Sequence, residues 1–234
     1  MYFYRLCGIN LASEMRLPEL EPQLSGDAAD GNFRPDVEFA LGEVPALADP
    51  SHTIRSYQLQ GDAAFLWDVK DYGRYLVTGG NRITVQPCPG ASDLAIRAVL
   101  IGPIQSVLWY QRRHLALHAS AVMRGEAAIC ISGKTGAGKS VLTALLAERG
   151  MPVMADDVCV LSDDDNDPRL LPGYASLRLW DDVADQIAGL RKITPAHING
   201  QKSVVAIGDA GPLPAAARIS DLVLLNARGA EFSI

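Results

Sequence analysis

The chain has 234 residues, a formal net charge of −6, 48% hydrophobic residues and 21% charged residues. This length allows one large domain or two small ones with a substantial core. The acidic balance disfavours nucleic acid as a partner, because no basic field is available to neutralise phosphates.

The chain start and its apolar runs predict no membrane partner. Met1–Arg5 lacks a basic region followed by a sustained apolar core, so no secretory signal is expected. The longest apolar window, Ala98–Tyr110, contains Pro103 and Gln105 and is too short to span a bilayer. The four cysteines show no C-x-x-C spacing, and they are expected to be reduced. We therefore expect a cytoplasmic protein.

Residues 1–90 are predicted to form a mainly-β domain. Short segments rich in β-branched and aromatic residues alternate there with Gly, Pro, Asp and Asn clusters. Gly79-Gly80-Asn81 indicates a hairpin turn, and Pro22–Pro35 reads as a surface loop. This domain either recognises a peptide or partner through a sheet edge or serves as a scaffold. The predicted strands are Tyr2–Leu11, Asp36–Leu41, Ile54–Leu59, Ala63–Val69, Arg74–Val77 and Arg82–Val85.

Residues 91–234 mix helical and strand patterns, so the fold class expected for the whole chain is α/β or α+β. A helical pattern from Ser92 to Arg112 is interrupted near Gly102-Pro103. The acidic segment Ser162–Pro168 is interpreted as a solvated turn rather than a metal site. The strands predicted here are Leu115–Val122, Ala127–Ser132, Pro152–Ala155, Val158–Leu161 and Asp221–Leu225.

The most informative segment is a glycine-rich loop with the pattern G-x4-G-K-S. It follows the apolar strand Ala127–Ser132 and precedes a helical pattern over Val141–Arg149 that ends at Gly150. Strand, glycine loop and helix together are the context of a phosphate-binding P-loop, in which backbone N–H groups surround the phosphates. We therefore predict binding of ATP with Mg²⁺. The nucleotide-binding candidates are Gly133, Lys134, Thr135, Gly136, Ala137, Gly138, Lys139 and Ser140.

Three side chains outside the loop are candidates for chemistry. Asp156 and Asp157 follow a strand after the P-loop helix, where a carboxylate for Mg²⁺ and a group that deprotonates the nucleophile are expected. Asp156, Asp157 and the loop residue Ser140 are the candidate metal ligands. His118 lies on the strand before the P-loop strand, where it either reaches the phosphates or is a core histidine.

Three segments together resemble the HPr kinase/phosphorylase family, namely His118–Ala121, Gly133–Ser140 and Arg149–Val158. Members of that family phosphorylate a protein serine, and their fold is related to phosphoenolpyruvate carboxykinase. The resemblance implies a P-loop catalytic domain of that type behind an N-terminal mainly-β domain. It further implies that His118 partners a catalytic carboxylate, that Lys139 and Ser140 hold phosphate and Mg²⁺, and that the Asp156-Asp157 pair supplies the base and metal support.

Departures from the family pattern change the expected substrate. Val141 stands where the family has Glu, Ala119 where it has Gly, and its Leu-Glu-x-Arg-Gly segment is replaced by Leu171–Asp182. That segment is similar to the HPr-kinase-related proteins of lasso-peptide clusters, which phosphorylate the C-terminal serine of a precursor peptide. Arg178 and Lys202 are candidate contacts to phosphate or to a peptide carboxylate, or else surface charges.

The expected function is therefore ATP-dependent phosphorylation of a serine on a peptide or small protein, such as a lasso-peptide precursor. One alternative is a bifunctional HPr serine kinase/phosphorylase. An alternative of another class is a nucleotide-binding sensor or assembly partner without phosphoryl transfer. Whether the chain forms a homo-oligomer is left open by the sequence.

Overall fold

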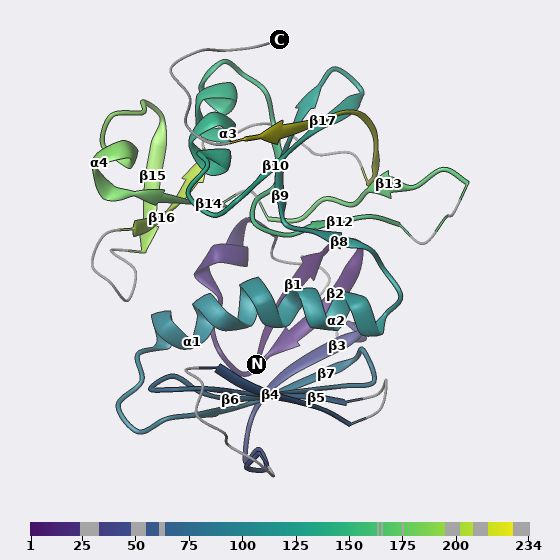
Figure 1. Cartoon of the computed structure of the whole chain (residues 1–234), viewed down its shortest axis with the longest axis vertical. Helices are drawn as coiled ribbons and strands as arrows, with labels where there is room; N and C mark the ends of the chain where they lie inside the picture. Colours follow the sequence, from purple (N-terminus) through teal and green to yellow (C-terminus); the bar gives the residue numbers. More distant parts are fainter. Residues whose placement is uncertain are drawn as a thin grey trace. The chain divides into compact units, whose positions relative to one another are not determined.

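The computed structural model describes residues 1–23, 33–47, 55–60, 64–162, 164, 166–174, 176–194, 202–207 and 215–226. The chain divides into two compact units, one over Met1–Ala116 and one that begins at Leu117. Mixed sheets with few helices make this an α+β protein (Figure 1). No helix in the described ranges is long and apolar enough to cross a membrane.

The first unit is built on a seven-stranded sheet with the order β1-β2-β3-β7-β6-β5-β4. Its strands pair antiparallel except for two parallel pairings, β2 with β3 and β3 with β7. Turn residues set the β6–β7 hairpin, since Gly79 and Gly80 have φ angles of 58° and 66°. The elements are β1 (Tyr2–Leu6), β2 (Ile9–Ser13), the 3-10 helix η1 (Pro18–Gln23), β3 (Val37–Leu41), β4 (Arg55–Gln60), β5 (Ala64–Val69), β6 (Gly73–Thr78) and β7 (Arg82–Pro87).

The sequence prediction of one strand over Tyr2–Leu11 is wrong. The chain reverses at Cys7 and Gly8, whose φ angles are 48° and 81°, and Leu6 pairs with Ile9. Two residues with positive φ form the tight turn whose twist matches antiparallel strands. Cys7 was not recognised as a turn residue because it stands in an apolar run. The prediction of a surface loop over Pro22–Pro35 falls largely on residues outside the described ranges.

The predicted helical segment forms two helices joined by a π-helical turn. They are α1 (Asp93–Val99), η3 (Leu100–Ile104) and α2 (Gln105–Gln111). The turn contains Pro103, which cannot donate to an α-helical ladder, so the expected interruption is confirmed. Ser92 caps α1 because its Oγ accepts from the Ala95 N–H at 3.2 Å.

Both helices belong to the first unit, although the sequence suggested a boundary after residue 90. Their apolar side, including Ile96 and Trp109, is buried. The Tyr75 hydroxyl donates to the Ile96 carbonyl at 3.3 Å, and the Gln111 amide donates to the Val77 carbonyl at 3.2 Å. These contacts hold the helices on the sheet, so the boundary between the two units lies after Ala116. The roles expected for the first domain stay predictions.

The second unit contains a five-stranded sheet with the order β11-β9-β10-β17-β13, a pair β12-β8 and a three-stranded sheet β14-β16-β15. The glycine loop follows β10, which pairs antiparallel with β9 and parallel with β17. The strands are β8 (Ala116–Leu117), β9 (Ala119–Arg124), β10 (Ala127–Gly133), β11 (Val153–Ala155), β12 (Cys159–Val160), β13 (Arg169–Leu170), β14 (Ser176–Trp180), β15 (Leu190–Thr194), β16 (Lys202–Ile207) and β17 (Ala217–Leu225).

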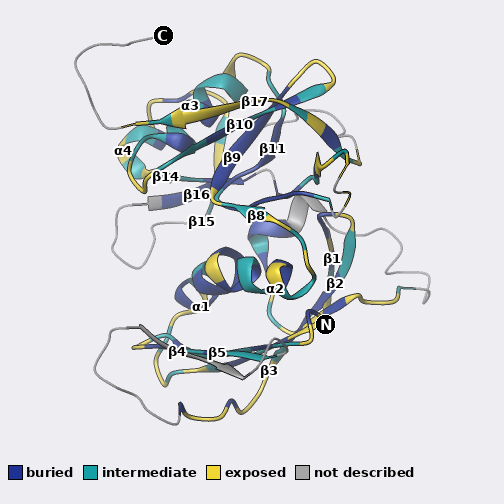
Figure 2. Cartoon of the chain, turned by 45° about the vertical axis from the view of Figure 1, so that its right-hand side comes forward, coloured by how far each residue is buried: buried dark blue, intermediate teal, exposed yellow. Residues whose placement is uncertain are grey.

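Two apolar clusters fix the strand ends that carry the candidate site. Helix α3 (Lys139–Glu148) packs with Val122, Val153 and Leu177, and the short helix α4 (Asp181–Ala184) belongs to the same cluster. Another cluster contains Cys130, Met154 and Cys159. Buried residues run along most of β9 in Figure 2. The two clusters therefore hold the ends of β9, β10 and β11 in fixed relative positions.

Candidate functional site

The glycine loop joins the end of β10 to the start of α3, as the sequence predicts. Gly133, Gly136 and Gly138 have φ angles of 152°, 84° and 98°, which residues with side chains rarely adopt. A Cβ atom on Gly133 would lie 2.6 Å from the Leu225 carbonyl oxygen of β17. Glycine is therefore required at this position both by the backbone conformation and by the close approach of the neighbouring strand.

The amino end of α3 is suited to an anion. A helix leaves its first N–H groups without intrahelical acceptors, and the N-cap residue Gly138 has no side chain that could accept from them. Lys139 is buried, with 8% of its surface exposed. Its ammonium donates to the Gly133 carbonyl at 2.9 Å and lies 3.0 Å from Nε2 of His118. The ammonium of Lys139 therefore lies next to the first residue of the loop.

His118 is brought to the loop by a break in the strand predicted over Leu115–Val122. The strand divides at this residue into β8 and β9, so the prediction of one continuous strand is wrong. The ring Nδ1 lies 3.1 Å from the Asp157 carboxylate and 3.1 Å from the Asp157 carbonyl. Lys139 donates to Nε2, so the proton of the neutral ring is on Nδ1, from where it is donated to Asp157.

The charges around His118 shift its pKa in opposite directions. The hydrogen bond to the Asp157 carboxylate raises the pKa of His118, whereas partial burial and the Lys139 ammonium lower it. The net pKa is above the ordinary value for histidine. The imidazole therefore links a carboxylate to an ammonium and gains a proton more readily than a free histidine.

Asp157 is partly buried and is surrounded by positive charge. Burial by itself would raise the pKa of Asp157, but the hydrogen bond with His118 and the charges of Arg178 and Lys139 together lower it. Arg178, on β14, places Nη1 3.6 Å from the other carboxylate oxygen. Asp157 is therefore a stable carboxylate at neutral pH.

Asp156 has a different environment, although it is the preceding residue. It is 2% exposed, and its carboxylate accepts from the Ser120 hydroxyl at 2.5 Å and the Ser140 hydroxyl at 3.0 Å. Its second oxygen accepts from the Arg178 backbone N–H at 3.2 Å. Burial raises the pKa of Asp156 despite these hydrogen bonds. A cation next to this carboxylate would compensate the buried charge.

The donor set fits a hard divalent cation. Ser140 donates its proton to Asp156 and so keeps lone pairs for a metal, and both residues offer the oxygen ligands that Mg²⁺ prefers. Across the described ranges, no three or more His, Cys, Asp or Glu side chains are grouped as a metal cage. A bound Mg²⁺ would therefore need further oxygens from a ligand such as a phosphate.

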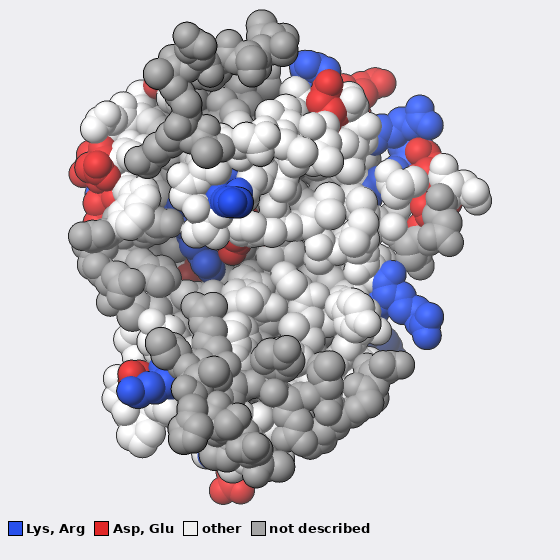
Figure 3. Space-filling model, viewed as in Figure 1, with Lys and Arg blue, Asp and Glu red and all other residues white. Residues whose placement is uncertain are grey.

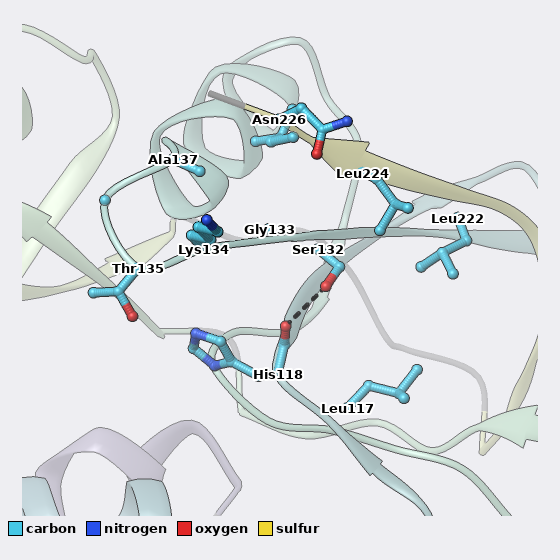
Figure 4. A pocket seen from close by; sticks show the side chains of 12 residues that line it. Leu117, His118, Ser132, Gly133, Lys134, Thr135, Ala137, Leu222, Leu224 and Asn226 are labelled. Carbon is cyan, nitrogen blue, oxygen red and sulfur yellow. Dashed lines mark hydrogen bonds between the residues drawn. The ribbon is translucent and has the colours of Figure 1, made fainter. Parts of the chain in front are cut away.

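An open pocket of about 920 Å³ adjoins the loop (Figure 4). One side is formed by the loop and by His118, and the other by apolar side chains of β8 and β17. In the face shown in Figure 3, Lys and Arg side chains are scattered, and several of them have acidic neighbours. The pocket is lined by Leu117, His118, Ser132, Gly133, Lys134, Thr135, Gly136, Ala137, Leu222, Leu224, Leu225 and Asn226.

The structure brings the predicted site residues into two neighbouring sets of hydrogen bonds. One set joins Asp157, His118 and Lys139, and the other joins Ser140 and Asp156. The side chain of Lys202 and parts of the acidic segment 162–168 lie outside what is described.

Sequence reasoning missed one residue of the site and the partner of another. The role of Ser120 was not recognised, although it lies two residues after His118, at the spacing of side chains on one face of a strand. Arg178 was expected on a phosphate or a peptide carboxylate but contacts Asp157, and nothing in its local sequence indicates that partner.

Comparison with known proteins gives matches among solved structures. No family model and no curated protein matches the chain. Among solved structures, the Hpr(Ser) kinase/phosphatase from Coxiella burnetii aligns with 18% sequence identity and a TM-score of 0.32. The alignment covers 47% of this chain and 64% of that one, so the chain spans less than two thirds of that structure.

Proposed function

We propose that the chain is an ATP-dependent kinase that phosphorylates a serine hydroxyl on a peptide or small protein. The observation that carries this proposal is the chain of contacts Asp157–His118–Lys139 beside the glycine loop. A module that only binds a nucleotide needs the loop and its lysine. A carboxylate held by a histidine beside that lysine is an arrangement for handling a proton next to a phosphate.

The different environments of the two aspartates support different roles for them. Asp156, with Ser140, would hold Mg²⁺, which when bound offsets the charge of the phosphates. Asp157 remains ionised and is linked to the loop lysine through His118, so it would accept the proton of the serine hydroxyl. The serine oxygen would bond to the γ-phosphorus as the bond to the β-phosphate oxygen breaks, and ADP would leave. Lys139 would stabilise the charge on the transferred group.

The resemblance to kinases of lasso-peptide clusters suggests the C-terminal serine of a precursor peptide as the acceptor. Mass spectrometry of a serine-terminated peptide would test this acceptor. The peptide is incubated with Mg·ATP and either the unmodified protein or the Lys139→Ala variant. A gain of one phosphate on the terminal serine, absent with the variant, would support the proposal. If HPr were phosphorylated and the peptide were not, the bifunctional HPr kinase/phosphorylase would be favoured instead.

Substitution of the aspartates separates a kinase from a nucleotide-binding sensor. Asp157→Asn keeps the side-chain shape but removes the proton acceptor, so turnover should fall by about 10²- to 10⁴-fold while ATP affinity changes little. Asp182→Asn, at an exposed position, is the matched control and should retain full activity. ATP binding without turnover in the unmodified protein, against every serine substrate tried, would instead support the sensor.

A further inference from the structure

Two leucines of β17 are exposed beside the glycine loop. Leu222 and Leu224 have 56% and 63% of their surface accessible, and both line the pocket together with Leu117. Figure 4 shows them projecting from β17 on the side of Leu117. We call Leu117, Leu222 and Leu224 the leucine wall. Exposed apolar side chains gathered on one side of a pocket, with polar groups on the other, are typical of a site for a small ligand.

The leucine wall is continuous with the loop. In the parallel pairing of β10 and β17, Leu224 is the partner of Ser132 and Leu225 is the partner of Gly133, the first residue of the loop. Asn226 follows directly and also lines the pocket. A ligand whose charged end occupies the loop therefore has an apolar surface and one amide within the same pocket.

The order of the strands indicates which end of a nucleotide would face the wall. In phosphoryl transfer, the attacking and leaving oxygens lie on opposite sides of the phosphorus, roughly in line. Asp157, the proposed proton acceptor, follows β11 at one side of β10, whereas β17 pairs on the other side. With Asp157 as the proton acceptor, the serine would approach from its side, and the leaving diphosphate with its nucleoside would extend toward β17.

The side chains on this side of the pocket suit a nucleobase. A nucleobase has apolar faces that gain free energy from burial against leucine side chains. Its edge carries hydrogen-bond donors and acceptors, and the amide of Asn226 offers both. The proposal rests on the proposed kinase function. We propose that the leucine wall and Asn226 form the nucleobase subsite of this protein, with the base against Leu222 and Leu224.

Binding of two probes tests the subsite. Affinities for Mg·ATP and for Mg·tripolyphosphate, which has the phosphates and no base, are measured by calorimetry. The double variant Leu222→Thr/Leu224→Thr removes the apolar surface without adding charge, and Thr suits a strand. Val223→Thr is the matched control, because Val223 lies between them on β17 and does not line the pocket.

The double variant should bind ATP about tenfold more weakly and tripolyphosphate as well as the unmodified protein does. Val223→Thr should change neither affinity. Circular dichroism confirms that each variant is folded.

Three results would overturn the subsite. If ATP affinity is unchanged in the double variant while Lys139→Ala weakens both probes, the base lies elsewhere and the kinase proposal stands. If ATP affinity is unchanged in the double variant but its KM for the peptide rises, the leucine wall binds the acceptor peptide. If the unmodified protein binds neither probe, the kinase proposal fails together with the subsite.

Discussion

Replacing Gly133 with alanine should strongly destabilise the sheet that carries the loop. The backbone there has φ +152°, a value that non-glycine residues adopt at a cost of about 1–3 kcal/mol. The new Cβ would also lie 2.6 Å from the Leu225 carbonyl oxygen and 3.1 Å from its Cβ. Since these atoms belong to the paired strand, relieving the overlap should cost about another 1–3 kcal/mol. The expected loss is therefore about 4 kcal/mol.

Gly125→Ala is the matched control at the other end of β10. Gly125 also has a positive φ, +63°, but no atom lies within 4 Å of its added Cβ. Only the backbone strain applies, so the expected loss is about 1 kcal/mol. The difference between the two variants, about 3 kcal/mol, combines the close approach between β10 and β17 with the larger backbone strain at Gly133.

Hydrogen exchange read by mass spectrometry is the appropriate assay, because it reports on each unit separately. Peptides covering β10 and β17 should exchange about 100-fold faster in Gly133→Ala than in Gly125→Ala. Peptides from the seven-stranded sheet should not differ between the variants. Equal protection of β17 in both variants would refute the reasoning, since the strand would then have moved away from the new methyl group without cost.

Further predictions concern two ion pairs. Proton NMR titration should give His118 a pKa above the usual histidine value, lower in Asp157→Asn and higher in Lys139→Met, because the carboxylate raises the pKa and the ammonium lowers it. A raised folded-state pKa of His118 stabilises the protein at low pH, and this contribution disappears as pH rises through the folded pKa. An unchanged His118 pKa in Asp157→Asn would contradict the pairing of His118 with the Asp157 carboxylate. In the first unit, Glu19→Gln should cost about 3–5 kcal/mol in urea unfolding, because Arg97 is buried at 8% exposure and its Nε lies 3.1 Å from the Glu19 carboxylate. Replacing both residues with Met should cost less than the single change, and a larger loss would argue against an unpaired buried charge as the cause.

The loop and its flanking elements could be predicted from the sequence because their signals are local. A run of apolar residues, three glycines at fixed spacing and a helical pattern that ends at Gly150 each depend on neighbouring residues. The hairpin at Gly79-Gly80 was predictable for the same reason. The turn at Cys7 was not, because a cysteine in an apolar run gives no turn signal even though its backbone has a positive φ.

The connections within the site depend on contacts between distant residues. Arg178 meets Asp157 only because β14 lies near the end of β11, and a local pattern contains no information on such contacts. The leucine wall was missed for the same reason. Asp221–Leu225 was predicted as a strand, but its parallel pairing with β10 is what places Leu224 beside the loop.

The different environments of Asp156 and Asp157 follow from the backbone between them. Consecutive residues of a regular strand point to opposite faces, and the chain leaves β11 at this point with φ +69° at Asp157. One carboxylate is therefore buried under Ser120 and Ser140, and the other reaches His118.

Asp and Asn tolerate positive φ better than most residues with side chains. Asp157→Asn should consequently preserve the turn and test the carboxylate alone. Asp157→Ala would combine the loss of the carboxylate with backbone strain of about 1 kcal/mol, which would also displace Asp156. If the residual activity of the alanine variant no longer depends on Mg²⁺ and that of the asparagine variant does, the turn itself positions Asp156, the proposed metal ligand.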